Sequence, residues 1–282
     1  MNKILVAIDF SVNSKKTIRF AIQLAAQTKA EIIFFHMVNM ITPVSDVAWN
    51  YAYYTQFQDE DIQLYKKQLE KLVKSVYTDK LPSRVKYLCD CEMGNNVGEQ
   101  IISYAKKHNI NFICVGARGT NTIATLFGNV AMHLIFNSPI PVFVIPKNYR
   151  LKVLSDICYA SDLENIEIEI KKVLELSKKL KAKVKVLHFD YEINLLKNHE
   201  KLVSIAQKHE TKGVKFHYEK MNALYPLIDN LSKIIRLSKP NLVVLFTKQN
   251  RKWFDRLLGK SQSAELSFVT KTPLLIYRKT RK

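Results

Sequence analysis

Short, continuous runs of apolar residues recur along the first half of the chain. They lie at 4–8, 32–38, 85–89, 112–116 and 142–145. Each run predicts a strand covered on both faces, as in a parallel sheet. Between the runs, apolar residues three and four positions apart predict helices, at Ile18, Ala21, Ile22 and Ala25, and at Val97, Ile101, Tyr104 and Ala105. Strands that alternate with helices predict an open α/β sheet with right-handed crossovers.

The same series recurs in the second half, which indicates an internal repeat. Its apolar runs lie at 157–160, 184–189, 214–219, 242–247 and 274–278. Ile18–His36 aligns without a gap onto Ile170–His188, and Pro141 and Pro273 precede the last strand of each copy. We therefore predict an α/β protein of two tandem, open, five-stranded parallel-sheet sandwiches, with domains at 1–148 and 149–282. A single sheet of ten strands is the alternative.

The first copy carries an additional segment after its second strand. Trp49, Tyr53 and Phe57 form one stripe at helical spacing, which fits either packing or a partner surface. A second stripe, most simply a core face, contains Ile62, Tyr65, Leu69, Leu72, Val73 and Val76.

Composition narrows the class of protein. With 47% hydrophobic and 24% charged residues among 282, the chain is neither disordered nor collagen-like nor a coiled coil. The formal net charge is +19, and its densest parts are 248–256 and 278–282. Lysine predominates over arginine, so a solvated surface is favoured over nucleic-acid binding, which stays an alternative for the second half.

Cysteine usage and hydropathy predict a cytoplasmic protein without a membrane segment. No apolar window reaches the length of a membrane span, and the first apolar run is too short for a signal peptide. The four cysteines form no CxxC pair and have no further ligands at zinc-site spacing, so free thiols in a reducing compartment are expected, with no metal site.

Glycine is scarce and clustered. The chain has 7 glycines where average usage would give about 20, and five lie in one stretch: Gly94, Gly98, Gly116, Gly119 and Gly128. A strand ends at Gly116, and a second glycine-led turn opens a helix at Gly128. Backbone N–H groups at such a turn attract phosphate, and Asp9 after the first strand could accept hydrogen bonds from a ribose. Two tight turns without a ligand are the alternative.

These motifs resemble the universal stress protein family. The likeness rests on the strand from Lys3 to Asp9, the strand ending Phe35-His36-Met37-Val38, the Glu92-Met-Gly94 turn, Gly116-x-x-Gly119…Gly128, and Ser138-Pro-Ile-Pro-Val142. It implies a Rossmann-like fold of the adenine nucleotide alpha hydrolase-like type, with strand order 3-2-1-4-5. Some members bind ATP and others do not.

In the first copy, the resemblance implies an adenine nucleotide, ATP above all, with magnesium as counter-ion. Ala7, Ile8 and Asp9 would contact base and ribose, with Met37 beside the adenine. Ribose and phosphates would be held by Gly116, Arg118, Gly119, Gly128, Asn129 and Val130. The loop between Gly119 and Gly128 is one residue shorter than in binding members, and Asn129 replaces their Ser or Thr.

The second copy has lost the glycine pattern. Phe246 and Gln249 occupy the two glycine positions, Lys260 follows Gly259, and Asp162 is the counterpart of Asp9 if the following loop is shortened by one residue. We expect this second site to be degenerate, because side chains at the glycine positions obstruct a polyphosphate.

No catalytic motif is present, so we expect a stress-response signalling module rather than an enzyme, although slow ATP hydrolysis is compatible with the sequence. His36 and His188 end apolar strands and are expected to be packed or hydrogen-bonded in the core. Expected partners are the nucleotide, the other repeat through the last strands, and a second copy of the chain. A nucleotide-free scaffold that binds a protein is the rival function.

Overall fold

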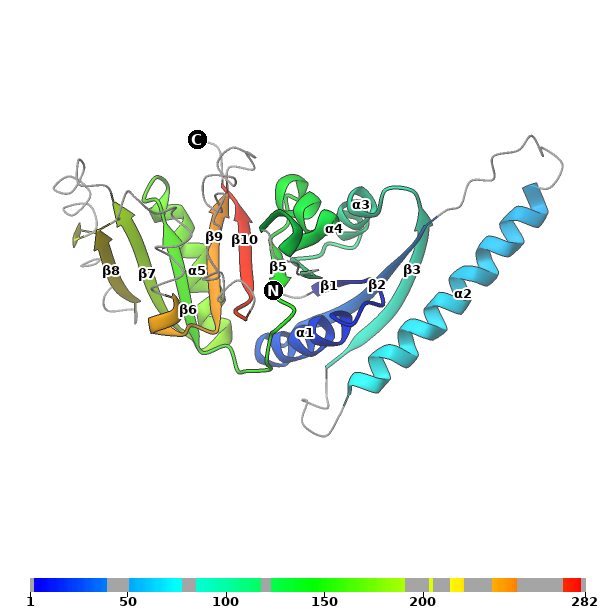
Figure 1. Cartoon of the computed structure of the whole chain (residues 1–282), viewed down its shortest axis with the longest axis horizontal. Helices are drawn as coiled ribbons and strands as arrows, with labels where there is room; N and C mark the ends of the chain where they lie inside the picture. Colours follow the sequence, from blue (N-terminus) through cyan, green and yellow to red (C-terminus); the bar gives the residue numbers. More distant parts are fainter. Residues whose placement is uncertain are drawn as a thin grey trace. The chain divides into compact units, whose positions relative to one another are not determined.

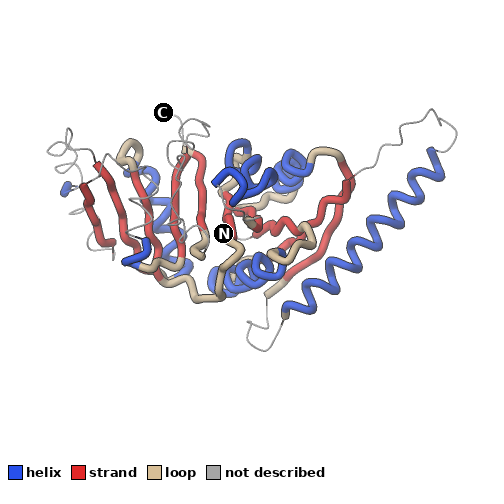
Figure 2. The backbone as a smooth tube through the Cα atoms, viewed as in Figure 1, coloured by secondary structure: helices blue, strands red, loops and turns tan. Residues whose placement is uncertain are grey.

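The structure, a computed structural model, describes residues 3–39, 51–77, 85–117, 123–190, 203–204, 214–220, 235–247 and 271–279. The chain divides into two compact units, Met1–Gly116 and Ala117–Lys282. Both consist of mostly parallel strands covered by helices, so the predicted α/β class is confirmed (Figure 2). The helix stripe from Trp49 to Phe57 lies outside the side chains that the structure describes.

The first unit is a parallel sheet in the order β3-β2-β1-β4. Its strands are β1 (Lys3–Ile8), β2 (Glu31–Asn39), β3 (Tyr87–Gly94) and β4 (Phe112–Gly116). Its helices are α1 (Ser14–Thr28), α2 (Tyr51–Val76) and α3 (Val97–Lys107). Helices α1 and α2 cover one face and α3 covers the other (Figure 1), so the inner strands β1 and β2 are mostly buried on both faces.

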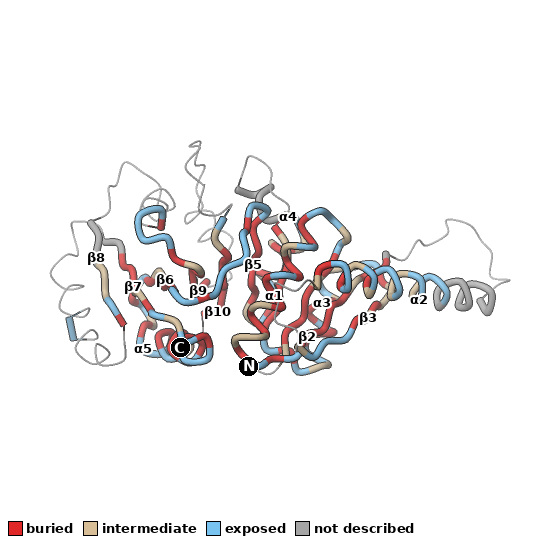
Figure 3. Tube along the Cα trace, turned by 90° about the horizontal axis from the view of Figure 1, so that it is seen from below, coloured by how far each residue is buried: buried red, intermediate tan, exposed pale blue. Residues whose placement is uncertain are grey.

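The core of this unit follows the apolar patterning of its helices. Helix α1 buries Ile18 and Ile22 against the sheet, and α2 buries Leu69, Val73 and Val76 completely. The α2 stripe is therefore a core face, as predicted. Figure 3 shows the buried positions gathered along the strands.

Strand β3 differs from its prediction. The apolar run suggested 85–89, but the strand runs from Tyr87 to Gly94. Its sequence alternates, with Cys89 and Cys91 buried and Asp90 and Glu92 half-buried. Alternation is typical of a strand with one covered face, and β3 lies at the edge of its sheet order. A search for continuous apolar runs misses such a strand.

The described part of the second unit includes α4 (Ile123–Asn137), α5 (Ile166–Leu180) and six strands. The strands are β5 (Val142–Ile145), β6 (Asp156–Ser161), β7 (Lys183–Asp190), β8 (Val214–Lys220), β9 (Leu242–Thr247) and β10 (Leu274–Arg278). Their order is β5-β10-β9-β6-β7-β8. Read from β8 to β10, this order is the 3-2-1-4-5 that the resemblance implies.

Strand β5 belongs to the first repeat, but it pairs antiparallel with β10 of the second, with Phe143 opposite Leu275. This antiparallel pairing places β5 beside the five parallel strands of the second repeat, and the predicted tandem α/β fold is confirmed. The last strands of the two repeats do pair within one chain, as expected. A domain boundary at 148/149 stays a prediction.

The internal repeat is confirmed at the level of single residues. Helices α1 and α5 both end at a lysine in the left-handed conformation, Lys29 (φ 55°) and Lys181 (φ 53°). The next residue closes each turn, Ala30 N–H donating to Ala25 O and Ala182 N–H to Ser177 O. These pairs follow the predicted alignment of Ile18–His36 with Ile170–His188.

Candidate functional site

Asp9 lies at the carboxyl end of β1, where the candidate nucleotide site was predicted. Ala7 pairs with Val115 of β4, so Asp9 and Gly116 follow neighbouring parallel strands at the same edge of the sheet. The side chain of Asp9 is exposed, while Ile8 and Met37 are 4% and 7% exposed. Of these residues, Asp9 is the one that presents a charged group to solvent at this edge.

The Asp9 carboxylate is oriented by the chain that follows it. Its Oδ1 accepts hydrogen bonds from the Ser11 N–H (3.0 Å) and the Ser14 hydroxyl (2.9 Å). Phe10, which lies between Asp9 and Ser11 in the sequence, adopts the left-handed conformation with φ 56°. The carboxylate thus sits at the start of α1, where the helix dipole favours negative charge. Ser14 was not predicted as part of the site.

Gly116 has a packing reason to be glycine. A Cβ atom there would meet Thr17 Oγ1 at 2.9 Å and Asn13 Nδ2 at 3.0 Å. Both contacts belong to the beginning of α1, which lies close against the end of β4. This close approach brings the N-terminal turn of α1 to the carboxyl end of the sheet.

His36 joins the strands behind Asp9. Its Nδ1 lies 2.7 Å from the carbonyl oxygen of Ile8, and its ring contacts Phe10 (centroids 4.5 Å apart) and Tyr65 of α2 (5.2 Å). His188 repeats this bond, with Nδ1 2.8 Å from Ser161 O. His36 is half-buried and His188 is buried, and both are packed and hydrogen-bonded as predicted.

We expect His36 to make stability depend on pH. Burial lowers its pKa from 6.5, outweighing the bond to Ile8 O and the charge of Asp9. Since the fold favours neutral imidazole, this stability is present above pH 6.5 and is lost as pH falls below 6.5 towards the lower folded pKa. Urea unfolding at a series of pH values should show this decline, and His36→Gln should reduce it. An NMR titration midpoint for His36 at or above 6.5 would contradict it.

Gly128 lies within α4 with φ 71° and ψ 162°, which interrupts the helix. This region of backbone dihedrals is essentially restricted to glycine. The prediction that a glycine-led turn opens a helix here is therefore confirmed. Arg118 and Gly119 lie outside the described residues, and Asn129 is exposed.

Replacing Gly128 by alanine should lower the free energy of unfolding by about 1–3 kcal/mol, the cost of such a conformation for an L-residue. Urea denaturation measures the effect. Gly98→Ala in α3 is the matched control and should cost less, because Gly98 is helical and alanine favours helix. Equal costs for the two variants would argue against strain at Gly128.

The second repeat contains the expected counterpart of Asp9. Asp162 Oδ1 accepts a hydrogen bond from Glu164 N–H at 3.1 Å, and Leu163 is left-handed with φ 63°. The turn is therefore the same as at Asp9 and Phe10. From Asp162 to Lys181 the chain is one residue shorter than from Asp9 to Lys29, as the alignment requires.

In the second repeat, a lysine of the same chain forms an ion pair with the Asp162 carboxylate. The Nζ of Lys279, which is only 5% exposed, forms an ion pair with Asp162 and lies 3.4 Å from Glu164 and 3.8 Å from Glu169. Glu169 also accepts a hydrogen bond from Tyr159. Burial raises the pKa of the Glu169 carboxyl, and the bond from Tyr159 and the charge of Lys279 oppose this rise.

Aromatic side chains fill the place of the first glycine. Phe246 stands where Gly116 stands in the first repeat and is 3% exposed. Its ring stacks on Tyr277 at 4.9 Å and meets the edge of Tyr159 at 5.5 Å. Gln249, at the second glycine position, lies outside the described residues.

Among the described residues, no group of His, Cys, Asp and Glu is arranged to hold a metal ion. Within the same residues, no helix combines the length and the apolar character needed to cross a membrane. All four cysteines are free and buried.

Solved structures resemble the whole chain. A universal stress protein from Archaeoglobus fulgidus has 14% identity and a TM-score of 0.66, covering 99% of this chain and 96% of its own. A protein of unknown function from Pseudomonas aeruginosa has 15% identity and a TM-score of 0.57, covering 99% and 92%. A universal stress protein in complex with cAMP matches 51% of this chain and 96% of its own, with 19% identity and a TM-score of 0.38.

No curated protein matches the sequence. The sequence model of the universal stress protein family matches residues 1–146, about half of the chain. The chain belongs to the universal stress protein family.

Proposed function

We propose that this protein is a stress-response signalling module whose first repeat binds one adenine nucleotide, ATP above all. The difference between the two repeats carries the proposal. Asp9 and Asp162 are both exposed at the ends of their strands, but the Asp162 carboxylate forms an ion pair with the buried Lys279. In this proposal the Asp9 carboxylate, which accepts hydrogen bonds from the Ser11 N–H and the Ser14 hydroxyl, faces the nucleotide, whereas Lys279 pairs with the corresponding acid of the second repeat.

In this proposal Asp9 accepts hydrogen bonds from the ribose hydroxyls, and Ala7 and Ile8 present backbone groups to the base, with Met37 beside it. Following the family resemblance, phosphates would be held by Gly116, Arg118, Gly119, Gly128, Asn129 and Val130, with magnesium as counter-ion. Glycines in this set allow the backbone to approach phosphate without a Cβ atom.

The protein would act by binding rather than by catalysis. Burial raises the pKa of the thiols of Cys91 to about 11 and of Cys89 and Cys158 to about 12, and that of Cys114 further. Protonated, buried thiols are poor nucleophiles. Four reduced cysteines in the core also suit a reducing compartment such as the cytoplasm.

The experiment is to release small molecules from the purified full chain by heat, identify them, and then titrate the chain with ATP by calorimetry. An adenine nucleotide in the released fraction, or saturable binding of ATP, supports the proposal. If no adenine nucleotide is released and no binding is detected at millimolar ATP, the proposal is refuted.

The rival function is a nucleotide-free scaffold, which the pairing of β5 with β10 favours because it holds the last strands of the two repeats together. A scaffold predicts that bulky substitutions at Gly119 leave stress survival intact in a complementation assay. A nucleotide sensor predicts that they abolish it.

A further inference from the structure

A cavity of about 230 Å³ lies in the second unit, at the amino ends of β6, β7 and β8. It is at the opposite ends of these strands from Asp162. Three of its lining side chains are lysines, Lys183 and Lys185 from β7 and Lys215 from β8. No part of the proposed nucleotide site lies here.

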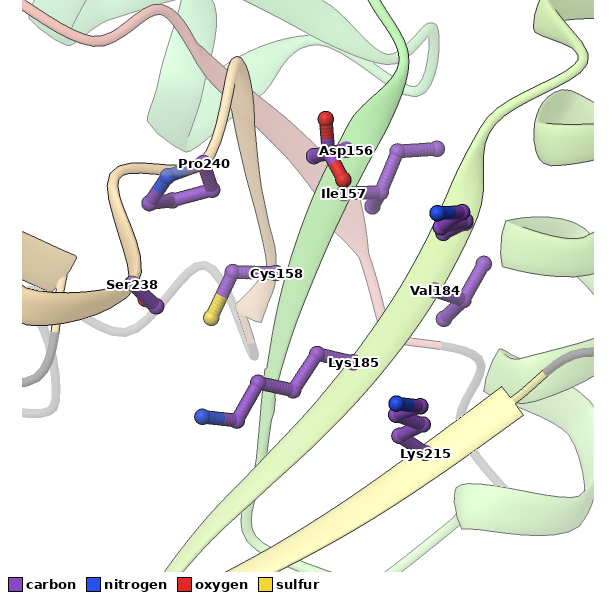
Figure 4. A pocket seen from close by; sticks show the side chains of 9 residues that line it. Asp156, Ile157, Cys158, Val184, Lys185, Lys215, Ser238 and Pro240 are labelled. Carbon is purple, nitrogen blue, oxygen red and sulfur yellow. The ribbon is translucent and has the colours of Figure 1, made fainter.

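The register of β6, β7 and β8 places the charged side chains opposite one another on adjacent strands. Cys158 of β6 pairs with Lys185, which in turn pairs with Lys215, so these three residues share one face of adjacent strands. Asp156 pairs with Lys183, two residues before Cys158 and Lys185, and so lies on the same face. In Figure 4 the side chains of Cys158 and Lys185 point to the same side of the strands.

Lys183 and Lys215 are exposed and Lys185 is half-buried, and their positive charges outnumber the negative charge of the described lining. Within the described part of the chain, no carboxylate lies within 4.0 Å of Lys183, Lys185 or Lys215. The one acid of the lining, Asp156, accepts a hydrogen bond from the Ser155 hydroxyl at 2.6 Å. Three positive charges and one negative charge leave the cavity with two positive charges in excess.

This arrangement is unusual for a parallel sheet. Val184 and Val186, on the other face of β7, are buried as such strands require. Lysines on the near face repel one another, and an anion between them removes the repulsion.

We propose that this lysine pocket binds a small dianion, namely inorganic phosphate or the phosphate group of a compact monoester. The charge of a phosphate dianion matches the excess of two, and ammonium groups bind phosphate as point charges. A cavity of about 230 Å³ admits a phosphate with a small organic substituent. Asp156 at one end would favour a substituent that carries a hydroxyl donor.

The test is a titration of the full chain with inorganic phosphate at constant ionic strength, followed by calorimetry. We expect saturable binding, and we expect Lys185→Met combined with Lys215→Met to raise the Kd at least tenfold. The control combines Lys171→Met with Lys178→Met on the exposed side of α5, which removes the same charge away from the cavity. The control should bind phosphate as the wild type does.

Asp9→Asn separates this pocket from the nucleotide site and should leave the phosphate Kd unchanged, even if ATP binding proves absent. No saturable binding, an equal loss in the α5 control, or a loss in Asp9→Asn with retention in the Lys185/Lys215 variant would each overturn the proposal. Urea unfolding verifies that every variant is folded at the titration temperature.

Discussion

Replacing Lys279 with methionine is expected to lower the free energy of unfolding by about 3 kcal/mol. Methionine keeps the length of the buried chain but removes the charge that faces Asp162, Glu164 and Glu169. Removing one partner of a buried ion pair costs about 3–5 kcal/mol. The lower end applies because Asp162 and Glu164 remain 33% and 49% exposed. Urea denaturation measures the loss.

Lys147 provides the matched control, because it follows Pro141 by six residues as Lys279 follows Pro273, and it is exposed. Lys147→Met should change stability by no more than about 0.5 kcal/mol. Adding Glu169→Gln to Lys279→Met should recover part of the loss, since it removes a buried negative charge. A loss no larger than that of the control would show that the ion-pair cluster contributes little.

Replacing Asp9 with asparagine is expected to weaken ATP binding by at least tenfold. The carboxylate would exchange two charge-assisted hydrogen bonds with the ribose for neutral ones, and bonds to charged groups contribute about 1.5–3 kcal/mol each. A factor of ten corresponds to about 1.4 kcal/mol, so even part of this difference is measurable. Calorimetric titration of the two proteins gives the ratio of Kd values.

Asp162→Asn is the control for this variant. It makes the same change in the same turn of the second repeat, and asparagine Oδ1 can still accept the turn hydrogen bond in both variants. Asp162→Asn also removes the charge that faces Lys279, so urea denaturation should verify that this variant is folded. It should leave the ATP Kd within twofold of the wild type. If both variants lowered affinity equally, or if Asp9→Asn bound ATP normally, Asp9 would have no role in recognition.

Most of the fold could be predicted, because the apolar runs of buried parallel strands are continuous and their spacing is regular. Strand β9 (Leu242–Thr247), for example, is buried throughout and was predicted to the residue. The predicted range of β3, 85–89, is shifted from the observed Tyr87–Gly94, because buried and more exposed residues alternate along this edge strand. The pairing of β5 with β10 was expected from the family resemblance, because such domains pair through their last strands.

The site was predicted less completely, because several of its contacts join residues that are far apart in the sequence. Asp9 and its counterpart Asp162 could be found by aligning the repeats. The ion pair of Lys279 with Asp162 joins residues 117 positions apart, and no local pattern predicts it. The lysine pocket was equally hidden, because Lys183, Lys185 and Lys215 read as scattered surface charges until register places them together.

The number of nucleotides bound by one chain tests the account most directly. Equilibrium dialysis of the full chain with ATP, at concentrations well above the Kd, should give one bound nucleotide per chain, held by the first repeat. Two per chain would contradict the closure of the second repeat by Lys279 and Phe246, and none would contradict nucleotide binding by the first.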